Sequence, residues 1–219
     1  SDLDGDGWTE SVDAFDYDGT QWSDIDEDGY GDNASGNDAD GCVALYGESR
    51  YDRLGCRDLD GDGWPNPSTS YTAKDGADAF PSDETQWLNR DGDKYGDNAS
   101  GNNSDDCPDV NGTSSIGKLG CLDSDGDGRS DEEDDLPNES SQWDDYDGDG
   151  FGDRIEGVKG DSCPTQKGNS TNGSQGCPDD DGDGVYNLED SWPNDIRIWS
   201  DGDGDGFADQ SATNLSDDC

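Results

Sequence analysis

Short runs of alternating aspartate and glycine recur along the chain, and their spacing is that of a cation-binding loop. They read DLDGDGW at 2–8, DLDGDGW at 58–64, DSDGDGR at 123–129 and DDDGDGV at 179–185. Carboxylates stand at loop positions 1, 3 and 5, and the glycine at position 6 permits a sharp turn. In calcium loops of the EF-hand type, position 7 adds its carbonyl and an acid at position 12 closes the shell. The acid here is Asp rather than Glu, so we expect a tighter loop or a single bound oxygen.

We call these four segments the first loops. In the second copy an insertion displaces the closing acid, and Asp78 holds the equivalent place before Ala79 and Phe80. The predicted ligands of the first loops are Asp2, Asp4, Asp6, Trp8, Asp13; Asp58, Asp60, Asp62, Trp64, Asp78; Asp123, Asp125, Asp127, Arg129, Asp134; and Asp179, Asp181, Asp183, Val185, Asp190.

A second string follows each first loop, and we call these the second loops. They read DIDEDGYGD (24–32), NRDGDKYGD (89–97), DYDGDGFGD (145–153) and DGDGDGFAD (201–209). Acids recur at positions 1, 3, 5 and 9, with an aromatic residue at position 7. Position 12 is not consistently acidic. Instead an Asp recurs two residues before a Cys, and we expect the half-cystine to hold that Asp against the ion.

The predicted ligands of the second loops follow from that pattern. They are Asp24, Asp26, Asp28, Tyr30, Asp32, Asp40; Asn89, Asp91, Asp93, Tyr95, Asp97, Asp105; Asp145, Asp147, Asp149, Phe151, Asp153, Asp161; and Asp201, Asp203, Asp205, Phe207, Asp209, Asp217. Asn89 replaces Asp at position 1 and Lys94 replaces Gly at position 6, so this site should be the weakest.

A single run of this kind could be an acidic turn, but eight in register argue against that reading. Mg²⁺ is the alternative metal. It prefers octahedral sites with retained waters and rarely uses all-protein cages. The sequence therefore predicts calcium, with about eight or more ions bound.

The composition explains why a bound cation matters. The 219 residues include 58 acidic and 12 basic side chains, a formal net charge of −46, and only 26% are hydrophobic, against roughly 45–50% in a globular domain. Such a chain cannot offset its conformational entropy with apolar burial. It is an acidic low-complexity tail unless something else supplies folding energy, and ion binding can do so.

The same numbers restrict the partners and the chemistry. Self-repulsion on this scale excludes nucleic acid and anionic membrane surfaces. The chain has no His, which removes the usual general base. No apolar run approaches the ~18 residues of a membrane span. With no Met and no signal peptide, we expect a mature chain or a piece of a longer one.

One period orders three residue types. Asp4, Asp60, Asp125 and Asp181, the four tryptophans at 22, 87, 143 and 199, and the cysteines at 42, 107, 163 and 219 recur in one shared rhythm, with a single longer step. The unit is therefore about 56 residues, and the longer step is a nine-residue insertion in the second copy, within 65–79. The predicted repeats are 1–56, 57–121, 122–177 and an incomplete 178–219.

The cysteines stand in pairs that share one fixed separation. This pattern in a chain without a hydrophobic core predicts disulfides formed in an oxidising, extracellular compartment. The predicted half-cystines are Cys42, Cys56, Cys107, Cys121, Cys163 and Cys177. Cys219 would open a fourth pair, so we expect the chain to be a window on a longer array. A free thiol or an intermolecular disulfide at Cys219 is the alternative.

Bulky residues at fixed register could cap neighbouring loops as small local cores. They are Trp22, Trp87, Trp143 and Trp199, with Phe15, Phe80, Leu136 and Trp192. Surface glycosylation is expected at Asn-x-Ser/Thr sequons, where a composition rich in these residues could also place triplets by accident. The sequons begin at Asn33, Asn98, Asn102, Asn111, Asn138, Asn169, Asn172 and Asn214. Asn33 and Asn98 share a repeat position, which favours those two.

The motifs DxDGDGxxxxxD and DxDGDGFGDxxxxxxxDxCP resemble the alternating motifs of thrombospondin type 3 repeats, and the resemblance covers essentially the whole chain. It implies an irregular, elongated fold with little regular secondary structure, in which the chain winds around a string of calcium ions and disulfides link the motifs. The units here are longer, with segments such as CPDVNGTSSIGKLGC between paired cysteines.

The expected function is that of a calcium-binding, extracellular repeat that forms a rigid stalk, spacer or filament on a cell surface. Further copies of the chain are possible partners in a filament. Two alternatives remain open: an accessory segment of a secreted enzyme or adhesin whose active domain lies elsewhere, and a soluble calcium buffer. We expect no enzyme here, because the recurring carboxylates are assigned to metal loops and no apolar pocket could raise a catalytic pKa.

Overall fold

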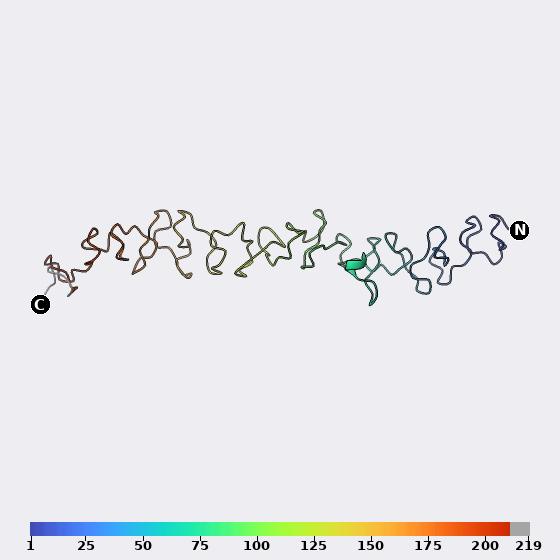
Figure 1. The fold of residues 1–219 in the computed structure, drawn as a ribbon, viewed down its shortest axis with the longest axis horizontal. Helices are drawn as coiled ribbons and strands as arrows, with labels where there is room; N and C mark the ends of the chain where they lie inside the picture. The colour runs from blue at the N-terminus through green and yellow to red at the C-terminus, as the bar shows by residue number, and fades with distance from the viewer. Residues whose placement is uncertain (211–219) are drawn as a thin grey trace. The chain divides into compact units, whose positions relative to one another are not determined.

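Regular secondary structure is almost absent from this protein. The computed structural model describes residues 1–210. Its described part contains one short 3-10 helix, η1 (Ala73–Asp75), and six isolated β-bridges in place of extended strands (Figure 1). The predicted irregular, disulfide-linked fold is confirmed in these respects. Alternating glycines explain it, because residues such as Gly182 and Gly184 take φ values of +78° and +97° that end any strand or helix.

The chain divides into two units, Ser1–Gly112 and Thr113–Cys219. The same local hydrogen bonds recur in both units at equivalent positions of the repeat. One such bond joins the residue after each first loop to the Trp that precedes the second loop. Its four copies run from Ala14 N to Trp22 O, Ala79 N to Trp87 O, Asp135 N to Trp143 O and Ser191 N to Trp199 O. Each first loop is thereby held against the start of the second loop that follows it.

A buried glutamine organises each of the first three second loops. Gln86 is 1% exposed. Its Nε2 donates to the carbonyls of Asn98 (3.0 Å) and Asn102 (2.9 Å), and its Oε1 accepts from Asn98 N at 2.9 Å. Gln21 and Gln142 make the equivalent bonds. Ile198 occupies this place in the last repeat and is equally buried. A single buried side chain, Gln in three repeats and Ile in the fourth, therefore forms the centre of this part of each repeat.

The cysteines close short hairpins. Cys42 bonds to Cys56 and Cys163 to Cys177, each pair with Cα atoms 5.1 Å apart. Cys107 and Cys121 are each part of a disulfide as well. The six predicted half-cystines are confirmed. Cys219 lies outside the described residues.

Each hairpin is completed by a buried Ser and then contacts the next first loop. The Oγ of Ser170 accepts from Cys177 N at 2.8 Å and donates to Ser174 O at 2.5 Å. The next two amides, of Thr171 and Asn172, donate to Gly184 O at 2.9 and 2.8 Å. The same pairs of bonds reach Gly63 O from Arg50 and Tyr51, and Gly128 O from Ser115 and Ile116. The glycine at position 6 of these three loops is therefore a docking point as well as a turn.

The aromatic residues at fixed register pack less deeply than the glutamines beside them. Trp22, Trp87 and Trp143 are half-buried and Trp199 is 36% exposed. Trp87 stacks on Trp64 with ring centroids 6.4 Å apart, and the Arg154 guanidinium lies 4.2 Å from the Trp143 ring centre. Among the described residues no helix is long and apolar enough to cross a membrane.

We expect Gln86→Ala to lower the free energy of unfolding by about 2–4 kcal/mol, because it removes three buried hydrogen bonds and leaves their partners unsatisfied. Thermal unfolding followed by circular dichroism at fixed calcium measures this. Glu84→Ala is the matched control, since Glu84 is exposed two residues away. Equal unfolding midpoints for the two variants would contradict the role given to the glutamine.

Candidate metal sites

The side chain at position 1, an Asp in every loop but the one at 89–97, holds the turn together. In the loop at 179–190, Asp179 Oδ1 accepts from Gly182 N and Asp179 Oδ2 accepts from Gly184 N, both at 2.8 Å. Both oxygens are therefore bound to the amides of their own loop. A carboxylate that receives two backbone N–H groups imposes a tight ring on the chain between them.

The carboxylates at positions 3 and 5 use only one oxygen in this way. Asp181 Oδ1 accepts from Asp183 N at 3.2 Å, and Asp183 Oδ1 accepts from Val185 N at 2.8 Å. The Oδ2 atom of each is buried and has no hydrogen-bond partner. The backbone thus fixes one oxygen of each carboxylate and leaves the other free inside the loop.

The closing acid at position 12 also has one oxygen bound to a backbone amide and the other without a partner. Asp190 is 8% exposed; its Oδ1 accepts from Trp192 N at 2.7 Å, and its Oδ2 is buried without a partner. Burial, and then repulsion by Asp183, Asp181 and Asp179, raises the pKa of Asp190. The position 12 acid therefore faces the carboxylates of its own loop, as the spacing predicts.

The other first loops share this geometry. Asp13, Asp78 and Asp134 each accept, at 2.7–2.8 Å, from the amide two residues on. Asp78, which follows the insertion, is fully buried with an unpartnered Oδ2. Burial, and then repulsion by Asp62, Asp60 and Asp58, raises the pKa of Asp78 to about 7. The insertion therefore leaves the closing acid in contact with its loop.

Two of the second loops differ from the first loops at position 3: Asp26 and Asp147 accept no hydrogen bond, whereas Asp91 and Asp203 keep the bond to the amide two residues on. In the loop at 145–161, both oxygens of Asp147 are buried without a hydrogen-bond partner. Asp145 again holds the turn, through Gly148 N and Gly150 N at 2.8 Å. Both oxygens of Asp149 accept amides, from Phe151 at 2.9 Å and from Gly168 in the disulfide hairpin at 2.9 Å. The hairpin therefore completes the loop from outside.

The Asp before each Cys does reach the second loop. Asp161 N donates to Gly152 O at 2.8 Å, which places the side chain beside the loop. Asp161 is 2% exposed; its Oδ1 accepts from Cys163 N at 2.6 Å and its Oδ2 is free. The equivalent bonds place Asp40 on Gly31 and Asp105 on Gly96, at 2.8 and 2.9 Å. Asp217 lies outside the described residues.

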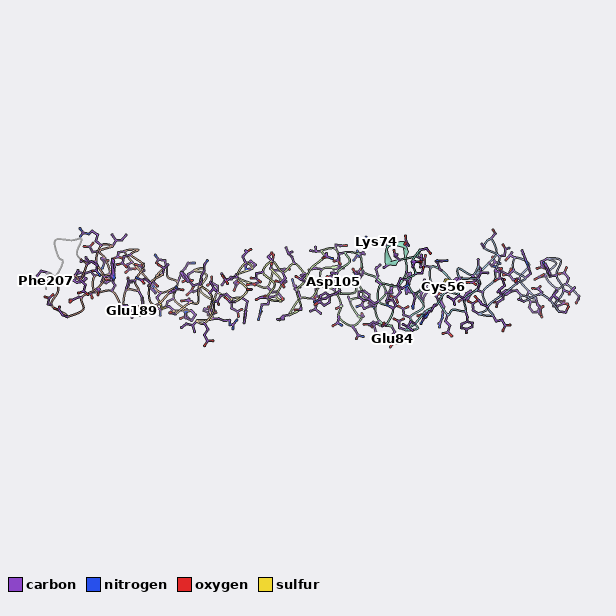
Figure 2. All side chains as sticks on the ribbon, turned by 90° about the horizontal axis from the view of Figure 1, so that it is seen from below. Cys56, Lys74, Glu84, Asp105, Glu189 and Phe207 are labelled. Carbon is purple, nitrogen blue, oxygen red and sulfur yellow. A yellow bond between two sulfur atoms is a disulfide. The ribbon has the colours of Figure 1, made fainter. Side chains whose placement is uncertain are left out.

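The carboxylate groups of these loops converge. In several loops one oxygen from each of three acids lies within 4.8 Å of the others: Asp2, Asp4 and Asp6; Asp24, Asp26 and Asp28; Asp58, Asp60 and Asp62; Asp91, Asp93 and Asp105; Asp123, Asp125 and Asp127. Asp105, labelled in Figure 2, joins its group from beyond the loop turn. The group of Asp91, Asp93 and Asp105 could not form from an acidic turn alone, because Asp105 lies far along the chain from Asp93.

The loop at 89–105 departs from the others where its sequence does. The Asn89 amide donates from Nδ2 to Asp93 O at 2.9 Å, and Asn89 Oδ1 accepts from Gly92 N at 2.6 Å. Lys94 is not among the residues with positive φ, whereas the equivalent Gly29 and Gly150 have φ of +93°. That this site is the weakest stays a prediction.

Position 9 and position 7 play different parts. Asp153 Oδ1 accepts from Tyr146 N at 3.2 Å, and Asp32 Oδ1 accepts from Ile25 N at 3.3 Å, so position 9 closes the loop on position 2. Asp97 bonds to Arg90 and Asp209 to Gly202 in the same place.

No carbonyl at position 7 accepts a protein hydrogen bond within residues 1–210. These carbonyls remain available to an ion.

Buried oxygens without partners are far more numerous here than in ordinary proteins. The described chain has 22 buried side-chain polar atoms without a hydrogen bond, and all but Ser130 Oγ are carboxylate oxygens. Native proteins usually leave only a few such atoms per ~100 residues. Burial, and then repulsion by neighbouring acids, raises the pKa of Asp40, Asp105 and Asp161 to about 6. Repulsion among buried carboxylates is therefore a recurring feature of the described loops.

The predicted glycosylation sites differ in access. Asn33 and Asn98 are half-buried and donate from Nδ2 to Thr20 O and Thr85 O at 2.8 Å. The shared repeat position is therefore the less accessible one. The remaining described sequons are exposed: Asn102, Asn111, Asn138, Asn169 and Asn172. Asn214 lies outside the described residues, and glycosylation stays a prediction.

Two features of the sites escaped sequence reasoning. One is the glutamine before the Trp, which the QW dipeptide repeating at 21, 86 and 142 could have signalled. The other is the hairpin amide on Asp149 and, less closely, the Gly47 amide on Asp28 at 3.3 Å. No local pattern signals a contact between residues so far apart in the sequence.

No protein-family model and no curated protein sequence matches the chain. The function is therefore argued from the geometry of the loops.

The raised pKa values give a pH dependence to the metal-free chain. Asp78 and the three acids that close second loops have an ordinary value of 3.8 and values of about 7 and about 6 when folded. The folded chain therefore binds more protons, so these groups favour folding below pH 4 and lose that contribution as pH rises through 6–7. We expect the urea concentration at which half of the metal-free chain is unfolded to decrease as the pH is raised from 4 to 8. A midpoint that is constant or rises would contradict this, and Asp78→Asn should flatten the dependence.

Proposed function

We propose that this chain is a calcium-stabilised tandem repeat that serves as a structural segment of an extracellular protein. The proposal rests on one observation. Buried Oδ2 atoms without hydrogen-bond partners, from position 3 and from the closing acid, occur together in both kinds of loop, as in Asp181 with Asp190 and Asp147 with Asp161. Such atoms are costly unless a cation neutralises them.

The donor set selects the cation. The free groups are carboxylate and carbonyl oxygens, the chain has no His, and the cysteines at 42, 56, 107, 121, 163 and 177 are in disulfides. Hard cations prefer oxygen, and softer transition metals prefer nitrogen or sulfur. Ca²⁺ takes roughly 6–8 oxygens in flexible geometry, which suits loops that combine several carboxylates with a backbone carbonyl. Mg²⁺ fits less well, because it keeps its own waters.

Ion binding supplies the folding energy that the composition lacks. Each ion would replace repulsion among three or more carboxylates with attraction, and this gain belongs to the folded state alone. The eight loops that the sequence contains would hold about eight or more ions.

The hairpins support a structural role. In hairpin 163–177, Gly168 N contacts the preceding second loop at Asp149, and Thr171 and Asn172 contact the following first loop at Gly184. Successive ion sites are then linked by a disulfide-closed segment, as in other linear repeats where each unit contacts its neighbours. A stalk, spacer or filament body uses such linkage. The resemblance to thrombospondin type 3 repeats points the same way, and the disulfides fit secretion.

Calcium titration of the Asp161→Asn variant tests the proposal. Isothermal titration of the wild-type chain should give about eight sites, and the variant should lose or weaken one of them by about tenfold or more, because the closing carboxylate supplies charge and a free oxygen. Mg²⁺ should bind more weakly.

Glu156→Gln is the control, because it removes the same charge from an exposed residue of the same loop. Equal loss in the two variants would show that only net charge matters. Absence of saturable calcium binding to the wild-type chain would refute the proposed function.

A further inference from the structure

The insertion in the second repeat folds into a small structure of its own. Pro65 is fully buried, Ser68 and Tyr71 form an antiparallel bridge, and η1 follows. Tyr71 is only 9% exposed. A merely tolerated loop would not bury an aromatic side chain in a chain so poor in apolar residues.

The insertion packs against the disulfide hairpin that precedes it. The Tyr71 hydroxyl donates to Asp52 Oδ2, and the Arg53 guanidinium lies 4.8 Å from the centre of the Tyr71 ring. Arg53 also donates to Gly41 O. Figure 2 labels Cys56 of the hairpin and Lys74 of η1, which mark the two partners.

A cavity of about 180 Å³ lies between the hairpin and the insertion. Its apolar wall includes Pro65, Pro67, Tyr71 and the Cys42–Cys56 disulfide. Pockets for drug-sized ligands run to roughly 300–1,000 Å³. This cavity therefore admits a molecule with about one ring.

The polar wall of the cavity is positively charged. Arg53 and Arg57 both line it. Within the described residues neither guanidinium forms an ion pair, although the chain has 58 acids. Arg90 and Arg197, by contrast, each pair with an Asp. Arg57 can therefore pair with an anion from outside, and Arg53, which uses one N–H group on Gly41 O and lies over the Tyr71 ring, keeps further N–H groups for it.

Arginines at these two positions, three residues before and one residue after the second Cys of the hairpin, occur only at the hairpin that precedes the insertion. The residues equivalent to Arg53 are Lys118 and Ser174, and those equivalent to Arg57 are Leu122 and Pro178. Lys118 bonds to Glu132 at 2.6 Å. The two arginines and the insertion that faces them therefore occur together at this hairpin, and the sequence has neither at the two equivalent hairpins.

We propose that this cavity binds a small organic anion, a carboxylate on a six-membered ring. The guanidinium fork of an arginine matches a carboxylate in shape and charge, and the proline and tyrosine wall covers the ring. Two sources share this chemistry: an aromatic acid and an acidic sugar. The proposal is independent of the loop acids, since none of them lines the cavity.

Titration calorimetry with benzoate and, separately, glucuronate tests the proposal on the whole chain, with calcium present to reduce the repulsion of anions. We expect saturable binding of at least one probe. Arg57→Gln should weaken it about tenfold, the loss of one charge-assisted pair. Arg50→Gln is the matched control: Arg50 is exposed, lies nearby in the sequence and does not line the cavity. It should change affinity by less than about twofold.

The outcomes separate clearly. Tighter binding of glucuronate supports an acidic sugar, and tighter binding of benzoate supports an aromatic acid. No saturable heat with either probe would overturn the proposal. Equal weakening by the Arg57 and Arg50 variants would also overturn it, because net charge alone would then explain the binding. Circular dichroism confirms that both variants fold like the wild-type chain.

Discussion

The structure depends on backbone amides that bind one oxygen of a loop carboxylate and leave its other oxygen without a hydrogen bond. Loop amides hold one oxygen of Asp181, Asp183 and Asp190, and thereby turn the other oxygen inward. Each loop is thus preorganised around a point of strong negative potential. Repulsion between such close, buried charges opposes the fold until a cation is present. Glycine favours these bonds because the amides reach their carboxylates at positive φ, which costs a side-chain-bearing residue such as Glu27 (φ +64°) some strain.

The remainder of the fold does without a hydrophobic core. Gln21, Gln86 and Gln142 are buried in its place, and each satisfies backbone groups that the loop leaves open. Ser49 and Ser170 do the same inside the hairpins. These contacts are local and polar, so their net stabilisation is modest, about 1 kcal/mol for each hydrogen bond. On the proposed function, disulfides and bound ions would supply most of the stability.

The sequence predicted the parts of this design that follow from spacing. Acids at alternate positions, Cys pairs at one fixed separation and a closing Asp before each Cys are all visible as a period, and the structure brings Asp105 to Asp91 and Asp93. The role of Asp179 was less predictable, because spacing cannot tell a ligand from a carboxylate that holds amides. The cavity beside Arg57 could not be predicted at all, since it needs the insertion and the hairpin to meet in space.

Folding of this chain should depend on bound metal ions. Small-angle scattering of the chain with disulfides intact, first in calcium and then after chelation at neutral pH, tests it most directly. We expect a marked increase in the radius of gyration on chelation, because the buried carboxylates then repel one another without compensation. An unchanged radius of gyration would contradict it and would mean that the hydrogen bonds and disulfides hold the fold without an ion.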